Sequence, residues 1–335
     1  MLYDQFFAIL DSLLRPVMDK NIIIYGCQGG DFIRWFCERY YQKKVKAIVD
    51  RWELSPGITI LHLWSFYYIY DQNDIIINTT SKQIEEEFND TGEDWSKTGY
   101  QSDQIINLWS LIYKKNQLNE SDGRKWEISY YDWLEYKYGV DILITIKRKF
   151  VKGMHAHGYF PTEFRVFLEG ISDHEFSKED SILDIGCGKG SGIMALLACG
   201  FQTVGAVEYT ENIYQTLISN LRKMNIEYIE HMMDSDNQMV REKVNCYLGD
   251  ASCLKKQLDD YNWFFLFNPF SWEVVQSVLA NICNSLKEKP RKAYIFYAEP
   301  IGHKLIMDTK MFQIKKKLCS DFSCVSYYSY LYESI

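Results

Sequence analysis

Two glycine turns in this sequence could bring the backbone close to a bound ligand. The first follows the apolar run Asn21–Tyr25 and reads GCQGG, and the second follows Ser181–Ile185 and reads GCGKG. Glycine has no Cβ and adopts positive φ readily, so such turns permit a close approach to a ligand. The chain therefore offers two candidate binding sites, and the residues that follow each turn decide between them.

Acidic residues end three strand-like runs around the second turn. Asp184 ends the first run, Glu208 ends TVGAVE, and Asp250 follows NCYLG. Open α/β sheets bind ligands at the carboxyl ends of their strands. There Glu208 could accept hydrogen bonds from both hydroxyls of a ribose, and Asp250 could accept one from an exocyclic amine such as that of adenine. The pattern indicates an adenosine cofactor.

The first turn has a different spacing. Gly26, Gly29 and Gly30 read G-x-x-G-G, which lacks the second glycine that would admit a pyrophosphate. Asp50 ends the next strand-like run, VKAIVD, and could hold a ribose or a sugar. The alternative is that these glycines serve only the strand-to-helix turn, which needs no ligand.

Two segments at later strand ends could bind a second substrate. In FNPF, Pro269 stops a strand and leaves Asn268 and Phe270 at the sheet edge, while YAEP places Glu299 on the same rim. Asn268 and Glu299 are therefore candidate catalytic residues. The alternative is that Pro269 only ends the strand and Phe270 fills the core.

Candidate general bases lie just ahead of the second turn, in KGMHAHGYFPTEF. They are His155, His157 and Glu163. We select His157 as the catalytic candidate, against the alternative that both histidines are ordinary surface residues. The pair H-x-H could also begin a metal site, but no third ligand is evident, so no metal is predicted.

The alternation of apolar runs and helical segments predicts an α/β fold with two domains. Residues 1–95 should form a small Rossmann-like domain, residues 96–150 an irregular helical linker, and residues 151–335 a larger sheet. The larger sheet should have five parallel strands. The final two runs, near residues 311–319 and 324–333, are too close in sequence for a parallel crossover and must form an antiparallel hairpin.

Composition limits the function classes. The 335 residues carry a formal net charge of -8 at pH 7, which disfavours a large nucleic-acid footprint, although IKRKFVKG at 146–153 is locally basic. Nine cysteines without a C-x-x-C pair argue against a disulfide framework or zinc site. Apolar runs are too short to span a bilayer, and the N-terminus does not read as a signal peptide. We therefore expect a cytoplasmic protein.

From about residue 157 to the end, the chain resembles class I S-adenosylmethionine-dependent methyltransferases. The resemblance rests on LDIGCGKGSG, GAVE, GDA and FNPF, and more narrowly on an uncharacterised bacterial group in which an HGYxPT-like segment precedes the cofactor loop. It implies a seven-stranded sheet with the antiparallel hairpin, and a lid formed by the segment before the loop. The tight glycine spacing fits a sulfonium cofactor, which has no pyrophosphate, better than NAD.

The same resemblance implies a set of cofactor-binding residues. They are Asp184, Gly186, Cys187, Gly188, Gly190, Glu208, Tyr209, Asp250, Ala251 and Asn268. FNPF is also similar to the N-P-P-Y/F motif of amino-methyltransferases, in which the asparagine orients an amine. One proline of that motif is missing here, which places amine methylation in doubt.

The first domain resembles small Rossmann-like modules attached to bacterial enzymes that modify sugars and nucleotide sugars. The resemblance covers about 80 residues, through IYGCQGG, the VD pair and DIII. It implies an accessory module that binds an acceptor or partner, or that has lost its ligand.

Together these features predict a methyltransferase that uses S-adenosyl-L-methionine to methylate a small-molecule or glycan-type acceptor, at oxygen. One alternative is an N-methyltransferase acting on nucleic acid or protein, with aromatic residues stacking on a flipped base. A second alternative is a non-catalytic protein that binds the cofactor.

Overall fold

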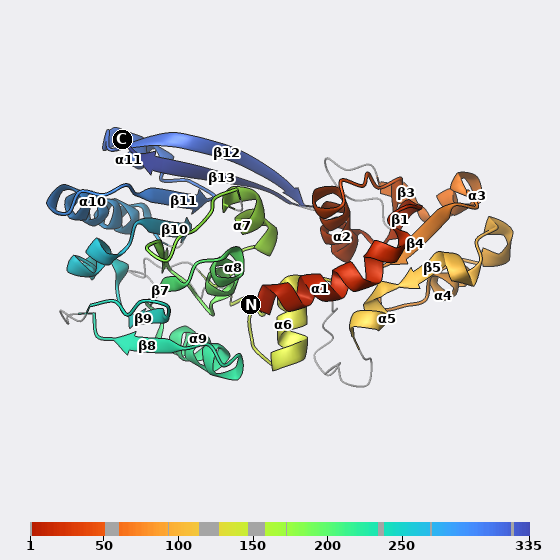
Figure 1. Ribbon diagram of the computed structural model, residues 1–335, viewed down its shortest axis with the longest axis horizontal. Coiled ribbons are helices and arrows are strands. Elements are labelled where there is room, and N and C mark those ends of the chain that lie inside the picture. The colour runs from red at the N-terminus through yellow and green to blue at the C-terminus, as the bar shows by residue number, and fades with distance from the viewer. Residues whose placement is uncertain are drawn as a thin grey trace. The chain divides into compact units, whose positions relative to one another are not determined.

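The computed structural model describes residues 2–50, 60–92, 94–113, 127–146, 158–171, 173–233, 238–268, 270–322 and 325–335. The chain divides into two compact units. Unit 1 comprises Met1–Lys137 with Asp321–Val325, and unit 2 comprises Tyr138–Ser320 with Ser326–Ile335. Each unit has its own sheet (Figure 1). Within the described ranges, no helix has the length and apolar character needed to cross a membrane.

Unit 1 contains a five-stranded parallel sheet in the order β3-β2-β1-β4-β5. Isoleucine-rich β1 and β4 form its buried centre, as expected for strands covered on both faces. The strands and helices are β1 (Asn21–Tyr25), β2 (Ala47–Asp50), β3 (Ile60–His62), β4 (Asp74–Asn78), β5 (Ile105–Asn107), α1 (Leu2–Leu14), α2 (Cys27–Tyr40), α3 (Phe66–Ile69), α4 (Ile84–Asn89), α5 (Leu108–Ile112) and α6 (Tyr130–Tyr138).

The predicted domain boundary at residue 95 falls inside unit 1. β5 pairs with β4 through Ile76 and Ile105, so the first part of the predicted linker 96–150 completes the sheet. A strand of three residues carries too little periodicity to be recognised from sequence. β3 was not predicted for the same reason, because it too has only three residues.

The first glycine turn is filled by protein side chains. Gly26 has φ +95°, and a Cβ there would lie 2.7 Å from both Thr79 Oγ1 and Thr80 Cγ2. The Thr79 hydroxyl donates to the carbonyls of Tyr25 and Gly26, at 2.8 and 3.1 Å. Gly30 similarly allows close packing on Ile24 of β1. These contacts explain the two glycines by packing and turn geometry, as the ligand-free alternative requires.

Unit 2 contains an eight-stranded mixed sheet in the order β12-β13-β11-β10-β6-β7-β9-β8. Six strands are parallel, and β13 runs antiparallel to β11. The strands and helices are β6 (Ser181–Ile185), β7 (Thr203–Glu208), β8 (Tyr228–His231), β9 (Val244–Leu248), β10 (Trp263–Phe267), β11 (Tyr294–Ala298), β12 (Phe312–Phe322), β13 (Val325–Ser334), α7 (Phe164–Ile171), α8 (Ser191–Cys199), α9 (Glu211–Lys223), α10 (Trp272–Glu288) and α11 (His303–Asp308).

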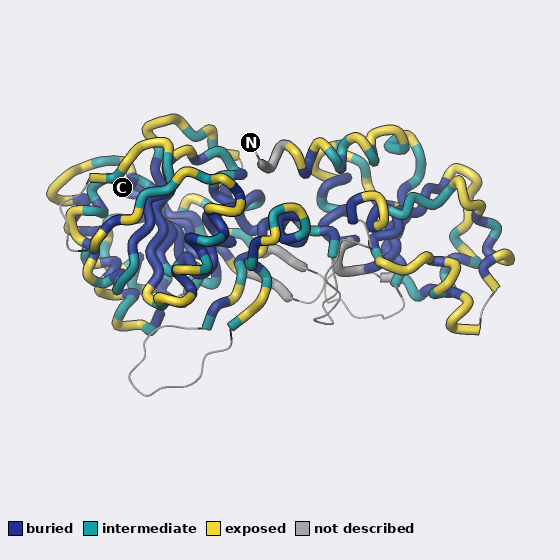
Figure 2. The backbone as a smooth tube through the Cα atoms, turned by 90° about the horizontal axis from the view of Figure 1, so that it is seen from below, coloured by how far each residue is buried: buried dark blue, intermediate teal, exposed yellow. Residues whose placement is uncertain are grey.

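The two faces of the unit 2 sheet have separate cores. Phe264 and Leu266 belong to the cluster that takes in the α10 residues Val275, Val278, Leu279, Ile282 and Leu286, which recur at helical spacing. Phe265 points to the other face, where its ring lies 4.6 Å from that of Phe167 in α7. Figure 2 shows these buried strands in dark blue, surrounded by more exposed segments.

The predicted count of seven strands is one short. The five predicted parallel strands and the terminal antiparallel strand are present, and β8 adds a sixth parallel strand beside β9. β8 escaped prediction because it is a short edge strand, of which only His231 is buried. The order of the strands places the carboxyl ends of β6, β7, β10 and β11 along one edge, where the cavity described below lies.

Candidate functional site

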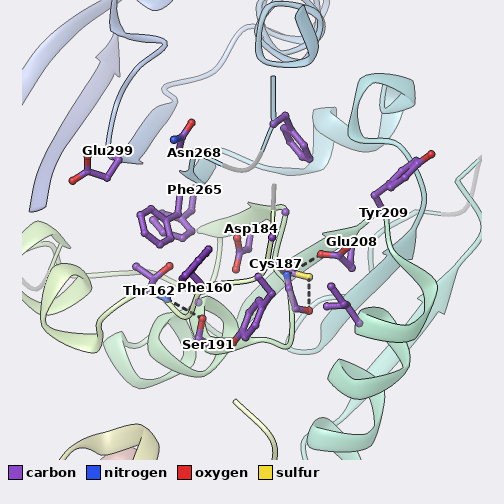
Figure 3. Close-up of a pocket in the computed structure, with 18 residues that line it drawn as sticks. Phe160, Thr162, Asp184, Cys187, Ser191, Glu208, Tyr209, Phe265, Asn268 and Glu299 are labelled. Atoms are coloured by element: carbon purple, nitrogen blue, oxygen red, sulfur yellow. Dashed lines mark hydrogen bonds between the residues drawn. The ribbon is translucent and has the colours of Figure 1, made fainter. Parts of the chain in front are cut away.

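Unit 2 contains a cavity of about 510 Å³ at the carboxyl ends of β6, β7, β10 and β11 (Figure 3). This volume is within the range of ligand pockets, about 300–1,000 Å³. Eight predicted site residues line it: Asp184, Gly186, Cys187, Gly188, Glu208, Tyr209, Asn268 and Glu299. Residues from four strand ends therefore meet in one space.

The glycine loop between β6 and α8 is built for close approach. Gly186, Gly188 and Gly190 all have positive φ, at +89°, +56° and +96°. A Cβ at Gly188 would lie 2.3 Å from the Tyr159 ring, so only glycine fits there. Gly190 serves a different purpose, because its Cβ would meet Leu217 of α9 at 2.6 Å and it does not line the cavity.

Glu208 is held at the end of β7 by two backbone donors. Gly188 N–H donates to Oε2 at 3.0 Å, and Thr210 N–H donates to Oε1 at 2.7 Å. Burial raises the pKa of this carboxyl, while the backbone hydrogen bonds from Thr210 and Gly188 oppose the shift. The side chain of Thr210 and the backbone of Tyr209 also hydrogen-bond to this carboxylate, which fixes its position at the edge of the cavity.

Asp184 is a buried carboxyl beside the same loop. Burial raises its pKa well above the ordinary range, and the nearby charge of Glu208 raises it further. Gly192 makes room for it, since a Cβ there would lie 2.3 Å from Asp184 Oδ2. Burial likewise keeps the Cys187 thiol protonated by raising its pKa. A cationic ligand would favour ionisation of Asp184 by offsetting both effects.

Lys189, the charged residue of the loop, is directed away from the cavity. Its ammonium donates to both carboxylate oxygens of Asp141 at 2.7 Å and to the carbonyl of Ile144 at 3.0 Å. Asn220 of α9 donates to the carbonyls of Asp141 and Lys189. These bonds fasten residues 141–144 to the glycine loop.

The ring of Tyr159 packs against the glycine loop at Gly188. An antiparallel bridge pairs it with Ile146 through hydrogen bonds of 2.9 and 3.0 Å, and its hydroxyl donates to the Ile142 carbonyl at 2.6 Å. Phe160, Thr162 and other residues of this side also line the cavity. The position of this segment over the loop was expected only from the resemblance to methyltransferases, because nothing in its residue types indicates the pairing of Tyr159 with Ile146.

Asn268 and Glu299 lie at the end of the cavity away from Glu208 and Tyr209 (Figure 3). Phe267 of β10 pairs with Ala298 of β11, so the residues that follow them are neighbours. Both have positive φ, +39° and +52°, which is uncommon for residues other than glycine. Backbone strain of this kind is frequent at functional sites.

The polar atoms at this end are incompletely paired. Asn268 Oδ1 is buried and accepts no hydrogen bond in the described part of the protein. Leaving such an acceptor unpaired costs about 1–3 kcal/mol. Glu299 Oε1 accepts from the Tyr328 amide at 3.1 Å, and the Glu299 amide donates to the Tyr328 carbonyl at 2.7 Å. A ligand with hydrogen-bond donors would find acceptors here.

Several predicted residues are not brought into the cavity. Asp250 caps the 3-10 helix Ala251–Cys253 by accepting from Ser252 N–H at 2.8 Å, and neither Asp250 nor Ala251 lines the cavity. Glu163 is exposed and does not line it either. His155 and His157, with the proposed lid before Gly158, lie outside the described residues. Among the described residues, no cluster has the composition of a metal site.

Met233 packs against Gly249, the residue that precedes Asp250. A Cβ at Gly249 would lie 2.7 Å from Met233 Cγ, so this methionine packs onto the end of β9. Met233 follows β8, the strand that was not predicted.

No protein-family model matches the chain, and no curated protein matches it. The solved structures that resemble it include the ribosomal protein L11 methylase of Lactobacillus delbrueckii subsp. bulgaricus, at 11% identity and a TM-score of 0.35, over 51% of this chain and 77% of that chain. Another is a precorrin 8W decarboxylase of Methanobacterium thermoautotrophicum, at 19% identity and a TM-score of 0.36, over 52% and 92%. A candidate methyltransferase of Escherichia coli, yhhF, matches at 14% identity and a TM-score of 0.34, over 51% of this chain and 86% of that chain.

Proposed function

We propose that unit 2 binds S-adenosylmethionine and transfers its methyl group to a small-molecule acceptor. The observation that carries the proposal is a single cavity with a fixed, hydrogen-bonded Glu208 at one end and the Asn268 and Glu299 pair at the other. One end suits a ribose diol, and the other suits a donor group on a second substrate.

The residues of the cavity fit the cofactor in three respects. Glu208 presents a carboxylate of fixed position to the cavity, where it can accept from ribose hydroxyls. Gly186 and Gly188 leave the backbone open, so that an extended ligand can lie against the loop. Asp184 supplies a buried carboxyl whose ionisation a sulfonium or ammonium group would favour.

Bound S-adenosylmethionine would supply an electrophilic methyl carbon. The protein then has to align an acceptor with it, exclude water and accept a proton. The aromatic residues Phe265, Phe267 and Phe270 line the acceptor end and limit access of water. Glu299 is the carboxyl at that end that can take a proton. The sequence favoured oxygen on a small or glycan-type acceptor, and such a hydroxyl would deliver its proton to Glu299.

Titration calorimetry of S-adenosylmethionine into three proteins tests the proposal. Wild type should bind saturably. Glu208→Ala should bind about 10-fold to 100-fold more weakly, because hydrogen bonds to a charged group contribute about 1.5–3 kcal/mol. Glu211→Ala is the control, because that exposed carboxylate lies three residues further on and does not line the cavity.

The control should match wild type in affinity, and thermal unfolding should show that both variants are folded. Equal affinity of wild type and folded Glu208→Ala would refute the proposed cofactor site.

A further inference from the structure

The part of the cavity lining that the structure describes has acidic residues without basic ones. They are Asp184, Glu208 and Glu299, and no lysine, arginine or histidine is among the described lining residues. Lys189 lies in the glycine loop between β6 and α8. Its ammonium donates hydrogen bonds to the Asp141 carboxylate and the Ile144 carbonyl. An acceptor bearing a phosphate or carboxylate near its reacting atom would meet no compensating charge from these residues.

The acceptor end is also aromatic. Phe265 and Phe267 lie on one face of β10, and Leu266 between them lies on the other. Both phenylalanines line the cavity, together with Phe160 and Phe270. Phe265 is fixed by Phe167 and by Phe296, whose ring centre lies 5.5 Å away. Aromatic faces attract cations, and aromatic walls with a carboxylate form a recognised site for ammonium groups.

The polar corner of this end contains acceptor atoms with unused capacity. Glu299 Oε1 accepts from the Tyr328 amide, and among the described residues neither Glu299 Oε2 nor Asn268 Oδ1 has a recorded hydrogen-bond donor. The β10 and β11 register makes Asn268 and Glu299 adjacent. A hydroxyl has one proton to donate, whereas an ammonium has several and can serve both side chains.

We propose that the acceptor is an amine carried on an apolar or aromatic body, and that it binds as an ammonium between the phenylalanine walls and the Asn268 and Glu299 corner. This inference rests on the proposed methyl transfer and specifies its substrate class. It favours nitrogen over the oxygen expected from sequence, without requiring the second proline of the N-P-P-Y/F motif.

The chemical step balances with these groups. The bound ammonium gives one proton to the Glu299 carboxylate, and the freed nitrogen lone pair attacks the methyl carbon. The N–C bond forms as the S–C bond breaks, and the bonding pair returns to sulfur, which becomes a neutral thioether. The product leaves as an N-methylammonium, and Glu299 releases its proton to solvent.

Three probes of similar shape test the inference on the full-length protein saturated with S-adenosylhomocysteine. They are 2-phenylethylamine, 2-phenylethanol and phenylacetate, which differ in charge at one end. Calorimetry should show the amine binding at least tenfold more tightly than the alcohol, and phenylacetate binding most weakly.

Glu299→Gln should reduce the affinity for the amine to that for the alcohol, while its affinity for S-adenosylhomocysteine stays within about twofold of wild type. Glu288→Gln is the control, since Glu288 is an exposed carboxylate at the end of α10. With S-adenosylmethionine in place of the product, 2-phenylethylamine should release S-adenosylhomocysteine and 2-phenylethanol should not.

The results separate two kinds of failure. If neither S-adenosylmethionine nor its product binds, the proposed function itself fails. If they bind but the amine is not preferred, if no probe binds, or if Glu299→Gln leaves amine binding intact, only the amine inference is overturned. Tighter binding of a single-stranded RNA oligonucleotide than of the amine would likewise overturn it and favour a nucleic-acid acceptor.

Discussion

Replacing Gly188 by alanine is a sensitive test of how the glycine loop is held. The residue has φ +56°, where alanine is disfavoured by about 1–2 kcal/mol. The new Cβ would also lie 2.3 and 2.4 Å from two carbons of the Tyr159 ring. Tyr159 cannot easily withdraw, because its hydroxyl bonds to Ile142 and its backbone to Ile146. Overpacking of this kind costs about 1–3 kcal/mol.

We therefore expect Gly188→Ala to lower the free energy of unfolding by about 2–5 kcal/mol. Gly139→Ala is a matched control in the same unit, because Gly139 has φ +65° but nothing within 4 Å of its would-be Cβ. The control should cost only the backbone contribution, about 1–2 kcal/mol. Urea denaturation followed by circular dichroism measures both, and the difference isolates the contact with Tyr159.

A double-mutant cycle with Tyr159→Ala makes the test sharper. If the ring causes the cost, the two substitutions should be strongly non-additive, with a coupling of about 1–3 kcal/mol. Equal effects of Gly188→Ala and Gly139→Ala, or additive effects in the cycle, would refute this account of the loop.

Three further substitutions probe other parts of the account. Asp184→Asn should raise the free energy of unfolding at neutral pH, because burial raises the folded-state pKa of Asp184. The gain should be absent below the unfolded-state pKa of about 4 and grow as pH rises through the raised value, as urea denaturation at several pH values would show. Gly26→Ala should lower the free energy of unfolding of unit 1 by about 2–4 kcal/mol and leave S-adenosylmethionine affinity unchanged. The control Gly92→Ala should lower it by only about 1 kcal/mol, because Gly92 has φ +82° but open space around its would-be Cβ. Lys189→Met should cost about 1–2 kcal/mol in the same assay, since Asp141 loses its partner but remains partly exposed; a cost as small as for an exposed lysine such as Lys178 would count against a structural role.

Much of unit 2 could be predicted because its strands are long apolar runs that end in distinctive residues. Asp184, Glu208, Asn268 and Glu299 each stand at or just after a strand end, and parallel strands bring such ends to one edge. The antiparallel hairpin followed from the short distance between its two runs. Adjacent placement of Asn268 and Glu299 additionally needs the β10 and β11 register, which pattern alone does not provide.

Other features show what local pattern leaves out. Asp250 caps a short helix through its bond to Ser252, and an aspartate at the start of DAS is typical of such a cap, so the sequence already contained that signal beside the predicted adenine contact. β8 and β5 are too short for a periodic signal, so the predicted strand count is one short and β5 was not expected in the first sheet. Tyr159 contacts Gly188 through a bridge between distant segments, which no local pattern specifies.

The most direct test of the central claim is calorimetric titration of the intact protein with S-adenosylmethionine and, in parallel, with NADH. The account predicts saturable binding of one S-adenosylmethionine per chain and no binding of NADH. The spacing of Gly186, Gly188 and Gly190 differs from the G-x-G-x-x-G spacing typical of a pyrophosphate site, and Thr79 and Thr80 pack into the other glycine turn. Binding of NADH in place of S-adenosylmethionine would contradict it, and the search for a reaction would then have to begin with redox chemistry.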